Sequence, residues 1–159
     1  ALKDLGVGVD LENERYLDRL MRGGGPFYRE IVDSGIRCGA GTDGSNFAPN
    51  NPWLNIYYMT TGVNVRGIPE NESHKITRIE ALRMWTSGSA YQNLDDDKGS
   101  FAIGNVADLA VLSDNFLTCT DAKLRKIKSV MTIVGGKVVH QGDFPDYAAI
   151  GEAFNYTGT

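Results

Sequence analysis

The amino-terminal half of the chain alternates short apolar runs with helical patterns. Gly6 to Leu11 and Ile36 to Thr42 are short runs of β-branched, apolar or small residues, which predict two strands, the second of them buried. Glu14 to Met21 carries its apolar residues on one face and predicts a helix. A second helix is predicted from Phe27 to Ser34, and Gly35 follows it where a left-handed cap needs a residue without a side chain. This alternation indicates an α/β fold.

Two more helices are predicted before the chain changes character. Residues 44 to 58 are rich in Asn, Pro and aromatic residues, which predicts a loop that runs into a short helix from Trp53 to Thr61. Thr77 and Glu80 have the spacing of a capping box, in which each side chain satisfies a free backbone N–H at the start of a helix. Apolar residues then recur at helical spacing, at Ile79, Leu82 and Trp85. A helix is therefore predicted after Thr77.

The chain becomes mainly β after Asn93. Asp95 to Gly99 predicts a polar turn, and alternating apolar positions then predict short strands. Gly135 and Gly136 lie between two such runs and predict a two-residue hairpin turn. The predicted strands are Gly99 to Ile103, Asp108 to Leu112, Val130 to Val134 and Lys137 to Gln141. The chain is thus expected to divide into residues 1–94, residues 95–142 and a tail, residues 143–159.

Composition and charge exclude several classes of partner. The formal net charge is −4 and there are no basic clusters, so neither nucleic acid nor an anionic membrane surface is expected as a partner. No run approaches the roughly 20 consecutive apolar residues of a membrane-spanning helix, and the start lacks a signal-peptide pattern. Cys38 and Cys119 are too few for a disulfide framework. We therefore expect a cytoplasmic protein, and the start without Met leads us to expect a piece of a longer sequence.

Asp43 is the first candidate for chemistry. It ends the predicted strand from Ile36 to Thr42, so its carboxylate is expected to project from the carboxyl edge of a sheet, where α/β folds keep their active sites. Thr42-Asp43-Gly44 also suits an ordinary turn, because Asp and Gly are favoured turn residues. From these residues alone the turn is the simpler interpretation.

A longer pattern favours the catalytic interpretation, because it resembles a known family. The segments that carry it are Asp33 to Gly44, Asn51 to Trp53, Thr77 to Thr86, Lys98 to Ser100, Gly104, Ala107 to Leu112 and Val134 to Val139. In this order they resemble the eighth barrel strand, the following loop and helix, and the return into the small β-sandwich of the amidohydrolase superfamily. The pattern is most similar to amidohydrolase family 3, which includes N-substituted formamide deformylases.

The resemblance implies a fold, a metal and a reaction. Residues 1–94 would form the last two β/α units of a TIM (β/α)8 barrel, and residues 95–142 would supply strands of the β-sandwich. One or two divalent metals, usually zinc, would be held by histidines from early strands and by an aspartate that Asp43 matches. Asp43 would bind the metal and take a proton from the water that attacks a carbonyl carbon. Three loop residues would line the pocket of a small-molecule amide substrate, namely Asn46, Asn51 and Trp53.

The chain also departs from the family pattern. The His-x-His pair, the bridging Lys or Glu and the two further histidines that the family places on earlier strands have no counterpart in this sequence. A complete barrel takes about 250 residues, so most of the barrel strands are missing. We therefore expect the chain alone to be inactive and to bind no metal.

Other polar residues favour structural roles. His74 and His140 are predicted to face solvent, since neither has spacing suited to a shared metal. Cys38 is predicted to be a buried core thiol. Asp95 to Asp97 lacks the alternating oxygen ligands of a calcium loop, which predicts a solvated turn. Asp108 is predicted to make a structural hydrogen bond at the entry to a strand.

Two other functions stay open from the sequence. One is a non-catalytic module that associates with itself or with a separate chain through exposed strand edges, because unpaired strands expose backbone groups and apolar faces. The other is a small α/β binding protein with a coincidental resemblance, which strands in Asp108 to Gln141 without a sandwich-like sheet would favour.

Overall fold

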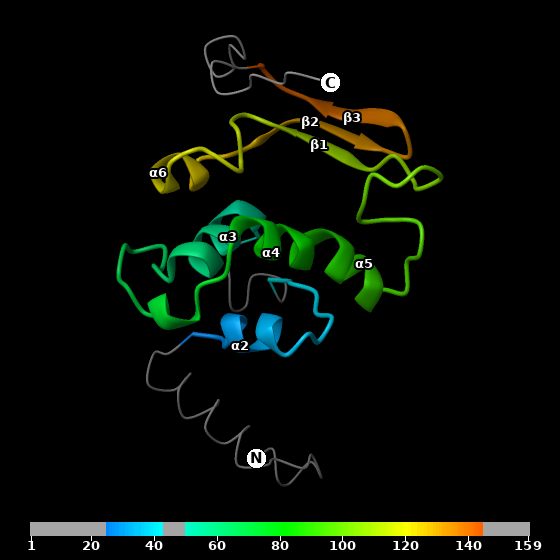
Figure 1. Cartoon of the computed structure of the whole chain (residues 1–159). Helices are drawn as coiled ribbons and strands as arrows, with labels where there is room; N and C mark the ends of the chain where they lie inside the picture. The colour runs from blue at the N-terminus through cyan, green and yellow to red at the C-terminus, as the bar shows by residue number, and fades with distance from the viewer. Residues whose placement is uncertain (1–24, 43–49, 145–159) are drawn as a thin grey trace, which may run out of the picture.

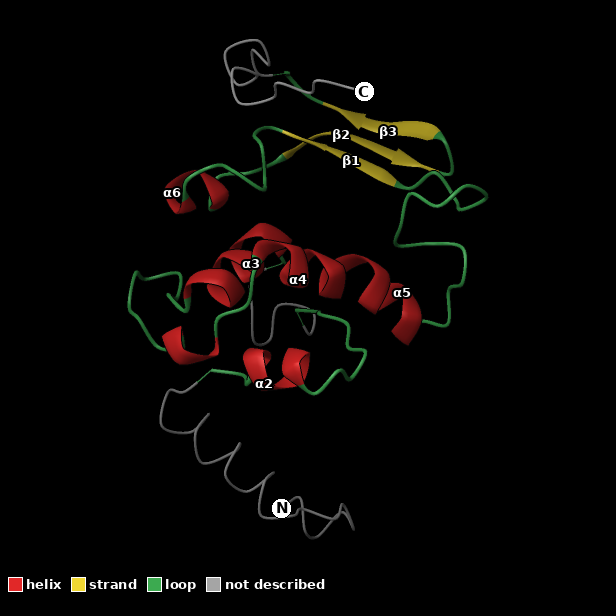
Figure 2. Cartoon of the chain, viewed as in Figure 1, coloured by secondary structure: helices red, strands yellow, loops and turns green. Residues whose placement is uncertain are grey.

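The chain is arranged in three layers. The computed structural model describes residues 25–42 and 50–144. A layer of helices lies between the short helix α2 on one side and a β-sheet on the other (Figure 1). Figure 2 shows the helices of this layer in red and the strands in yellow, and the colours of Figure 1 show that these helices precede the strands along the chain. The elements are α2 (Tyr28–Asp33), α3 (Pro52–Thr61), η3 (Glu72–His74), α4 (Arg78–Arg83), η4 (Met84–Gly88), α5 (Ser89–Gln92), β1 (Leu109–Leu112), α6 (Asp121–Leu124), β2 (Ser129–Val134) and β3 (Lys137–Gln141).

Helix α3 begins and ends at residues that suit those positions. The side-chain oxygen of Asn51 accepts a hydrogen bond from the Trp53 N–H at 3.0 Å. Pro52 occupies the first helical position, where no intrahelical partner exists for an N–H. Gly62 follows the helix with a φ of 72°, the left-handed value that ends many helices. The helix predicted in this region is confirmed, and it is one residue longer at its start.

Helix α4 begins with the predicted capping box. The Thr77 hydroxyl accepts a hydrogen bond from the Glu80 N–H, and the Glu80 carboxylate accepts one from the Thr77 N–H at 2.7 Å. The helix then continues through a π-helical turn, η4, into α5. The capping box is therefore confirmed, whereas the π-turn has no counterpart in the sequence prediction.

The core of the described chain lies between helices α3 and α4 on one side and the region of α6 on the other. Ile56 and Met59 of α3 and Ala81 of α4 are buried in one hydrophobic cluster. Leu124 of α6 and Ile127 just after it join the same cluster from the other side. The loop that carries α6 therefore packs onto the helical layer, although it lies between two strands in the sequence.

The sheet is antiparallel, with strand order β1-β2-β3. Gly135 and Gly136 form the turn between β2 and β3 with φ values of 55° and 76°, left-handed values that favour glycine. Asp108 accepts a hydrogen bond from the Gly135 N–H at 2.8 Å, which joins the entry of β1 to this turn. The predicted hairpin and the structural role of Asp108 are thus confirmed. A second sheet, which a sandwich needs, is not found among the described residues.

Two segments predicted as strands, Ile36 to Thr42 and Gly99 to Ile103, form no strand. A strand needs a neighbour with which to exchange backbone hydrogen bonds, and no strand pairs with either segment among the described residues. Ile36 is 69% exposed, so the predicted burial of the first segment is wrong at this end. The segment instead lies beside η4, and the Ala40 N–H donates a hydrogen bond to the Met84 carbonyl at 3.0 Å.

Helix α2 confirms the helix predicted from Phe27 to Ser34, and Gly35 follows it with the expected left-handed φ of 72°. The strand predicted at Gly6 to Leu11, the helix predicted at Glu14 to Met21 and most of the tail lie outside the described residues. Within the described part of the chain, no helix has the length and apolar character needed to cross a membrane.

Candidate functional site

The segment that leads to Asp43 lies against the helix formed by α4, η4 and α5. Cys38 and Ala40 pack against the hydrophobic cluster from this segment. The Ser89 hydroxyl of α5 lies 3.0 Å from the Ala40 carbonyl oxygen, and the Ala40 N–H is bound to the Met84 carbonyl. Both backbone groups of Ala40 are therefore anchored three residues before Asp43.

Asp43 and Asn46, the predicted catalytic residue and one predicted pocket residue, lie outside the described residues. The residues that flank them are described, and the Thr42 hydroxyl donates a hydrogen bond to the Asn50 side-chain oxygen at 2.9 Å. Thr42 and Asn50, the described residues on either side of positions 43–49, are therefore in direct contact. The roles of Asp43 in catalysis and metal binding, and of Asn46 in the pocket, stay predictions.

Asn51 and Trp53, the other two predicted pocket residues, both have structural contacts. The side-chain oxygen of Asn51 caps α3, and its carbonyl accepts a hydrogen bond from the Asn55 amide at 2.9 Å. The Trp53 ring packs against Phe116, with ring centroids 5.6 Å apart. These contacts account for both residue types without a ligand, and a role in substrate binding stays a prediction.

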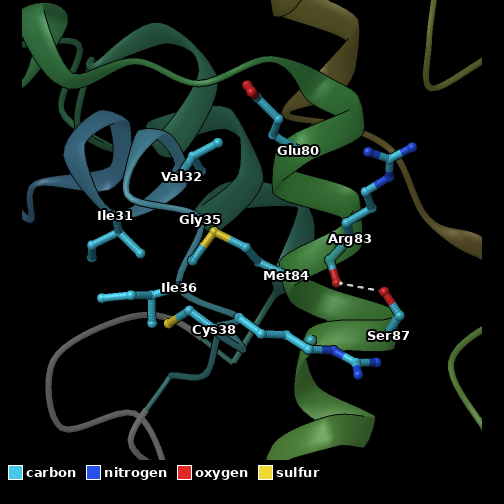
Figure 3. Close-up of a pocket in the computed structure, with 11 residues that line it drawn as sticks. Ile31, Val32, Gly35, Ile36, Cys38, Glu80, Arg83, Met84 and Ser87 are labelled. Atoms are coloured by element: carbon cyan, nitrogen blue, oxygen red, sulfur yellow. Dashed lines mark hydrogen bonds between the residues drawn. The ribbon is translucent and has the colours of Figure 1, made fainter.

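A hollow of about 500 Å³ lies between α2, residues 35–38 and the helix from α4 to η4. Figure 3 shows Ile31 and Val32 of α2 on one side of it and Met84 on the other, with Cys38 between them. Cys38 is half-buried and lines the hollow, so its predicted place as a buried core thiol is corrected. Glu80 is the one carboxylate among the lining residues, so the hollow contains no pair of carboxylates for acid–base catalysis.

Glu80 is itself engaged by two partners. Arg29 of α2 binds both of its carboxylate oxygens, each at 3.0 Å, and Thr77 donates its N–H to one of them. The Arg29 guanidinium, followed by the Thr77 hydrogen bond, lowers the pKa of Glu80 to about 2. Glu80 therefore stays ionised near neutral pH and joins α2 to α4. The capping-box pattern identifies Glu80 in the sequence, but no local signal identifies Arg29, which lies 51 residues away.

His74 differs from its predicted place. Its Nδ1 lies 2.6 Å from a Glu30 carboxylate oxygen, and its ring packs edge-on against Phe27 with centroids 5.2 Å apart. The side chain is only 13% exposed, so the prediction that it faces solvent is wrong. His140 lies exposed on β3, as predicted.

A zinc site needs about four ligands from the set of His, Cys and carboxylate side chains. No group of three or more such residues comes together within residues 25–42 and 50–144. The described residues therefore do not fit a zinc ion by themselves.

Comparison with known proteins finds a family that matches most of the chain. The model of the Amidohydrolase family matches residues 1–140. The N-substituted formamide deformylase of Arthrobacter pascens is 29% identical over 112 residues, which are 68% of this chain and 20% of that protein.

Two solved structures share the fold. They are atrazine chlorohydrolase TrzN from Arthrobacter aurescens TC1, as a mutant complexed with zinc and atraton and as the protein complexed with zinc. The first has a TM-score of 0.53 at 24% identity and covers 82% of this chain and 31% of that one. The second has a TM-score of 0.50 at 23% identity and covers 79% and 30%. The chain thus spans a fifth to a third of the length of these proteins.

Proposed function

The chain belongs to the amidohydrolase family, and from this membership we propose that it is the carboxyl-terminal portion of a metal-dependent hydrolase. The bond cleaved is a non-peptide carbon–nitrogen bond of an amide or formamide-like small molecule. Membership argues against the alternative of a small α/β binding protein with a coincidental resemblance. The observation that carries the proposal is the family match, which covers residues 1–140 and so includes the segment that ends at Asp43.

Asp43 has the central role in the proposed site. Its carboxylate would contribute one ligand to a divalent metal, which we propose to be zinc because both structural neighbours are zinc complexes. When bound, such a metal would lower the pKa of a water molecule, so that the water could lose a proton and act as a nucleophile near neutral pH. The Asp43 carboxylate accepts a proton from the attacking water and returns it to the leaving nitrogen. Asn46, Asn51 and Trp53 line the substrate pocket in this proposal.

The other ligands come from outside this chain. Among the described residues no cluster of ligands accompanies the segment that leads to Asp43. The chain also spans only 20% of its formamide deformylase relative, which leaves room for the missing ligands in a longer polypeptide. We therefore propose that residues 1–94 are the last two β/α units of a barrel, in which residues 36–42 would become a strand by pairing with strands of the longer polypeptide. The chain alone is proposed to be inactive.

The test compares this chain with a polypeptide in which it follows the upstream sequence of its own gene. Release of formate from an N-substituted formamide is measured in both. The expected result is no release by the chain alone, and release by the longer polypeptide that stops on chelation and returns with zinc.

Two substitutions in the longer polypeptide distinguish a specific role of Asp43 in catalysis from a general effect of removing one negative charge. Asp43→Asn should lower kcat about a thousandfold, as expected for loss of a positioned proton acceptor. Asp96→Asn, in an exposed turn, should leave kcat unchanged. Equal activity of Asp43→Asn and the unchanged protein would overturn the assignment of Asp43.

A second candidate function is self-association, and β3 favours it. This edge strand has all five residues exposed, including Val138 and Val139. An exposed apolar edge can pair with the same edge of another copy. Sedimentation equilibrium of the chain should show dimers, and the Val139→Lys variant should be monomeric. A chain that stays monomeric at every concentration would exclude this function.

A further inference from the structure

The segment before Asp43 passes unusually close to the helix behind it. A Cβ atom at Gly88 would collide with the carbonyl oxygen of Cys38, and one at Gly39 would lie 2.8 Å from the Ser89 Cα. Gly88 has an ordinary helical φ of −69°, so its backbone conformation does not require glycine. Glycine is needed at these two positions because the two backbones almost touch.

Hydrogen bonds fix the register of this contact. The Ala40 N–H donates to the Met84 carbonyl at 3.0 Å. The Ser89 hydroxyl lies 2.9 Å from the same Met84 carbonyl and 3.0 Å from the carbonyl of Ala40, so it can donate to either oxygen. One side chain thus bridges the helix and the segment.

The π-turn explains why the Met84 carbonyl can receive these donors. A π-turn inserts one extra residue into a helical turn, and helix distortions of this kind turn carbonyl groups toward partners outside the helix. Such turns are less stable than α-helix and occur frequently at functional sites. Here η4 spans Met84–Gly88, and the residue next in sequence is Ser89.

We propose that Ser89 is a positioning residue, which acts with the η4 turn to hold the backbone of residues 38–42, the segment that leads to the carboxylate proposed to be catalytic, Asp43. The inference rests on the proposed function and deepens it. Catalytic groups must be held within a fraction of an ångström, and a misplacement of about 1 Å can lower a rate a hundredfold. Ala40 is close enough to Asp43 along the chain for its anchoring to have this effect.

The first experiment measures the contact itself in the 159-residue chain. Amide hydrogen exchange at Ala40 is followed by NMR in the unchanged chain and in Ser89→Ala. Loss of one typical hydrogen bond should accelerate the exchange about five-fold, and the amide resonances of Thr42 and Asp43 should move.

Two variants control this measurement. Ser87→Ala removes a hydroxyl from the same turn, where it contacts only the Arg83 carbonyl at 3.4 Å among the bonds described, and should leave Ala40 unchanged. Ser89→Thr keeps the hydroxyl and should stay close to the unchanged chain. Equal exchange at Ala40 in Ser89→Ala and the unchanged chain would overturn the proposal.

The second experiment uses the longer polypeptide of the proposed function. Ser89→Ala should lower kcat per bound zinc by about ten- to a hundredfold with little change in KM, and Ser89→Thr should restore it. A purely structural loss would instead lower the zinc content and the activity together. An active protein whose kcat does not respond to Ser89→Ala would overturn the positioning role alone, whereas an inactive unchanged protein would overturn the proposed function.

Discussion

The helical layer and the sheet differ in how deeply they bury their apolar side chains. In the helical layer Ile56 is 1% exposed and Ala81 is 0% exposed, and both belong to one hydrophobic cluster. In the sheet every residue of β3 is exposed, and Val139 reaches 61%. The helices therefore contribute a buried apolar core within the described chain, whereas strand β3 leaves its apolar side chains uncovered.

The difference follows from the way each kind of element satisfies its backbone. A helix makes its hydrogen bonds within one segment, so α3 and the helix from α4 to α5 can form with the residues at hand. A strand depends on its neighbours, and a three-stranded sheet has two edges that lack them. Stability should therefore reside in the helical layer.

The strongest test of this comparison shortens one apolar side chain to Ala in each region. Ile56→Ala should lower the free energy of unfolding by about 4 kcal/mol, because it leaves a cavity in the core. Val139→Ala, at a side chain of β3 that is 61% exposed, should change it by less than about 0.5 kcal/mol. Urea denaturation followed by circular dichroism measures both, and equal effects would contradict the comparison.

A second pair of substitutions compares two left-handed glycines. Gly62→Ala should cost about 3 kcal/mol, because φ is 72° and the new Cβ would lie 2.5 Å from the Asn71 carbonyl carbon. Gly136→Ala in the hairpin has a similar φ of 76° but no atom within 4 Å, so it should cost only about 1 kcal/mol. Thermal unfolding of the two variants measures the difference, and a larger loss at Gly136 would place more stability in the sheet than we infer.

The sequence predicts those elements whose signals are local. The capping box needs only Thr77 and Glu80, and the hairpin needs only Gly135 and Gly136 between apolar runs. The apolar run from Ile36 to Thr42 gives a wrong prediction, because a strand is a property of two segments and the run reveals only one.

The candidate site shows the same difference between features with a local sequence signal and features without one. The resemblance to a family identifies Asp43 as a candidate, but the family pattern carries no information on what holds the backbone before it. Ser89 and Ala40 are 49 residues apart, and a serine inside a helical pattern has no feature that predicts this contact. Arg29 and Glu80 likewise meet only once α2 packs beside α4.

The third prediction concerns the ion pair that joins α2 to the helical layer. The pKa of Glu80 lies near 2 in the folded chain and near its usual 4.5 when unfolded. Its stabilising effect is therefore complete above about pH 4.5 and is lost as the pH falls towards 2. Glu80→Gln should lower the free energy of unfolding by about 1 to 2 kcal/mol at pH 7, a value reduced for the partial exposure of both partners.

The same measurement at several pH values separates this pair from ordinary surface charge. The difference between Glu80→Gln and the unchanged chain should shrink steadily from pH 4.5 to pH 2. Asp95→Asn removes a more exposed pair with Lys98, at 3.3 Å, and should have an effect below about 0.5 kcal/mol at every pH. A difference for Glu80→Gln that is constant with pH would show that the capping contact, and not its charge, stabilises the helix.

The smallest effect is expected at the entry of the sheet, where Asp108 accepts the hydrogen bond from Gly135. Asp108→Ala should loosen the turn between β2 and β3 and accelerate exchange of the Gly135 amide about five-fold, the loss of one typical hydrogen bond. The global free energy of unfolding should change by less than about 0.5 kcal/mol, because local opening of an exposed hairpin does not require the helical layer to unfold. Exchange at Ala81 in the core should therefore stay unchanged. If both amides accelerate together, the sheet and the helices unfold as one unit, and the contrast between the two regions is one of exposure alone.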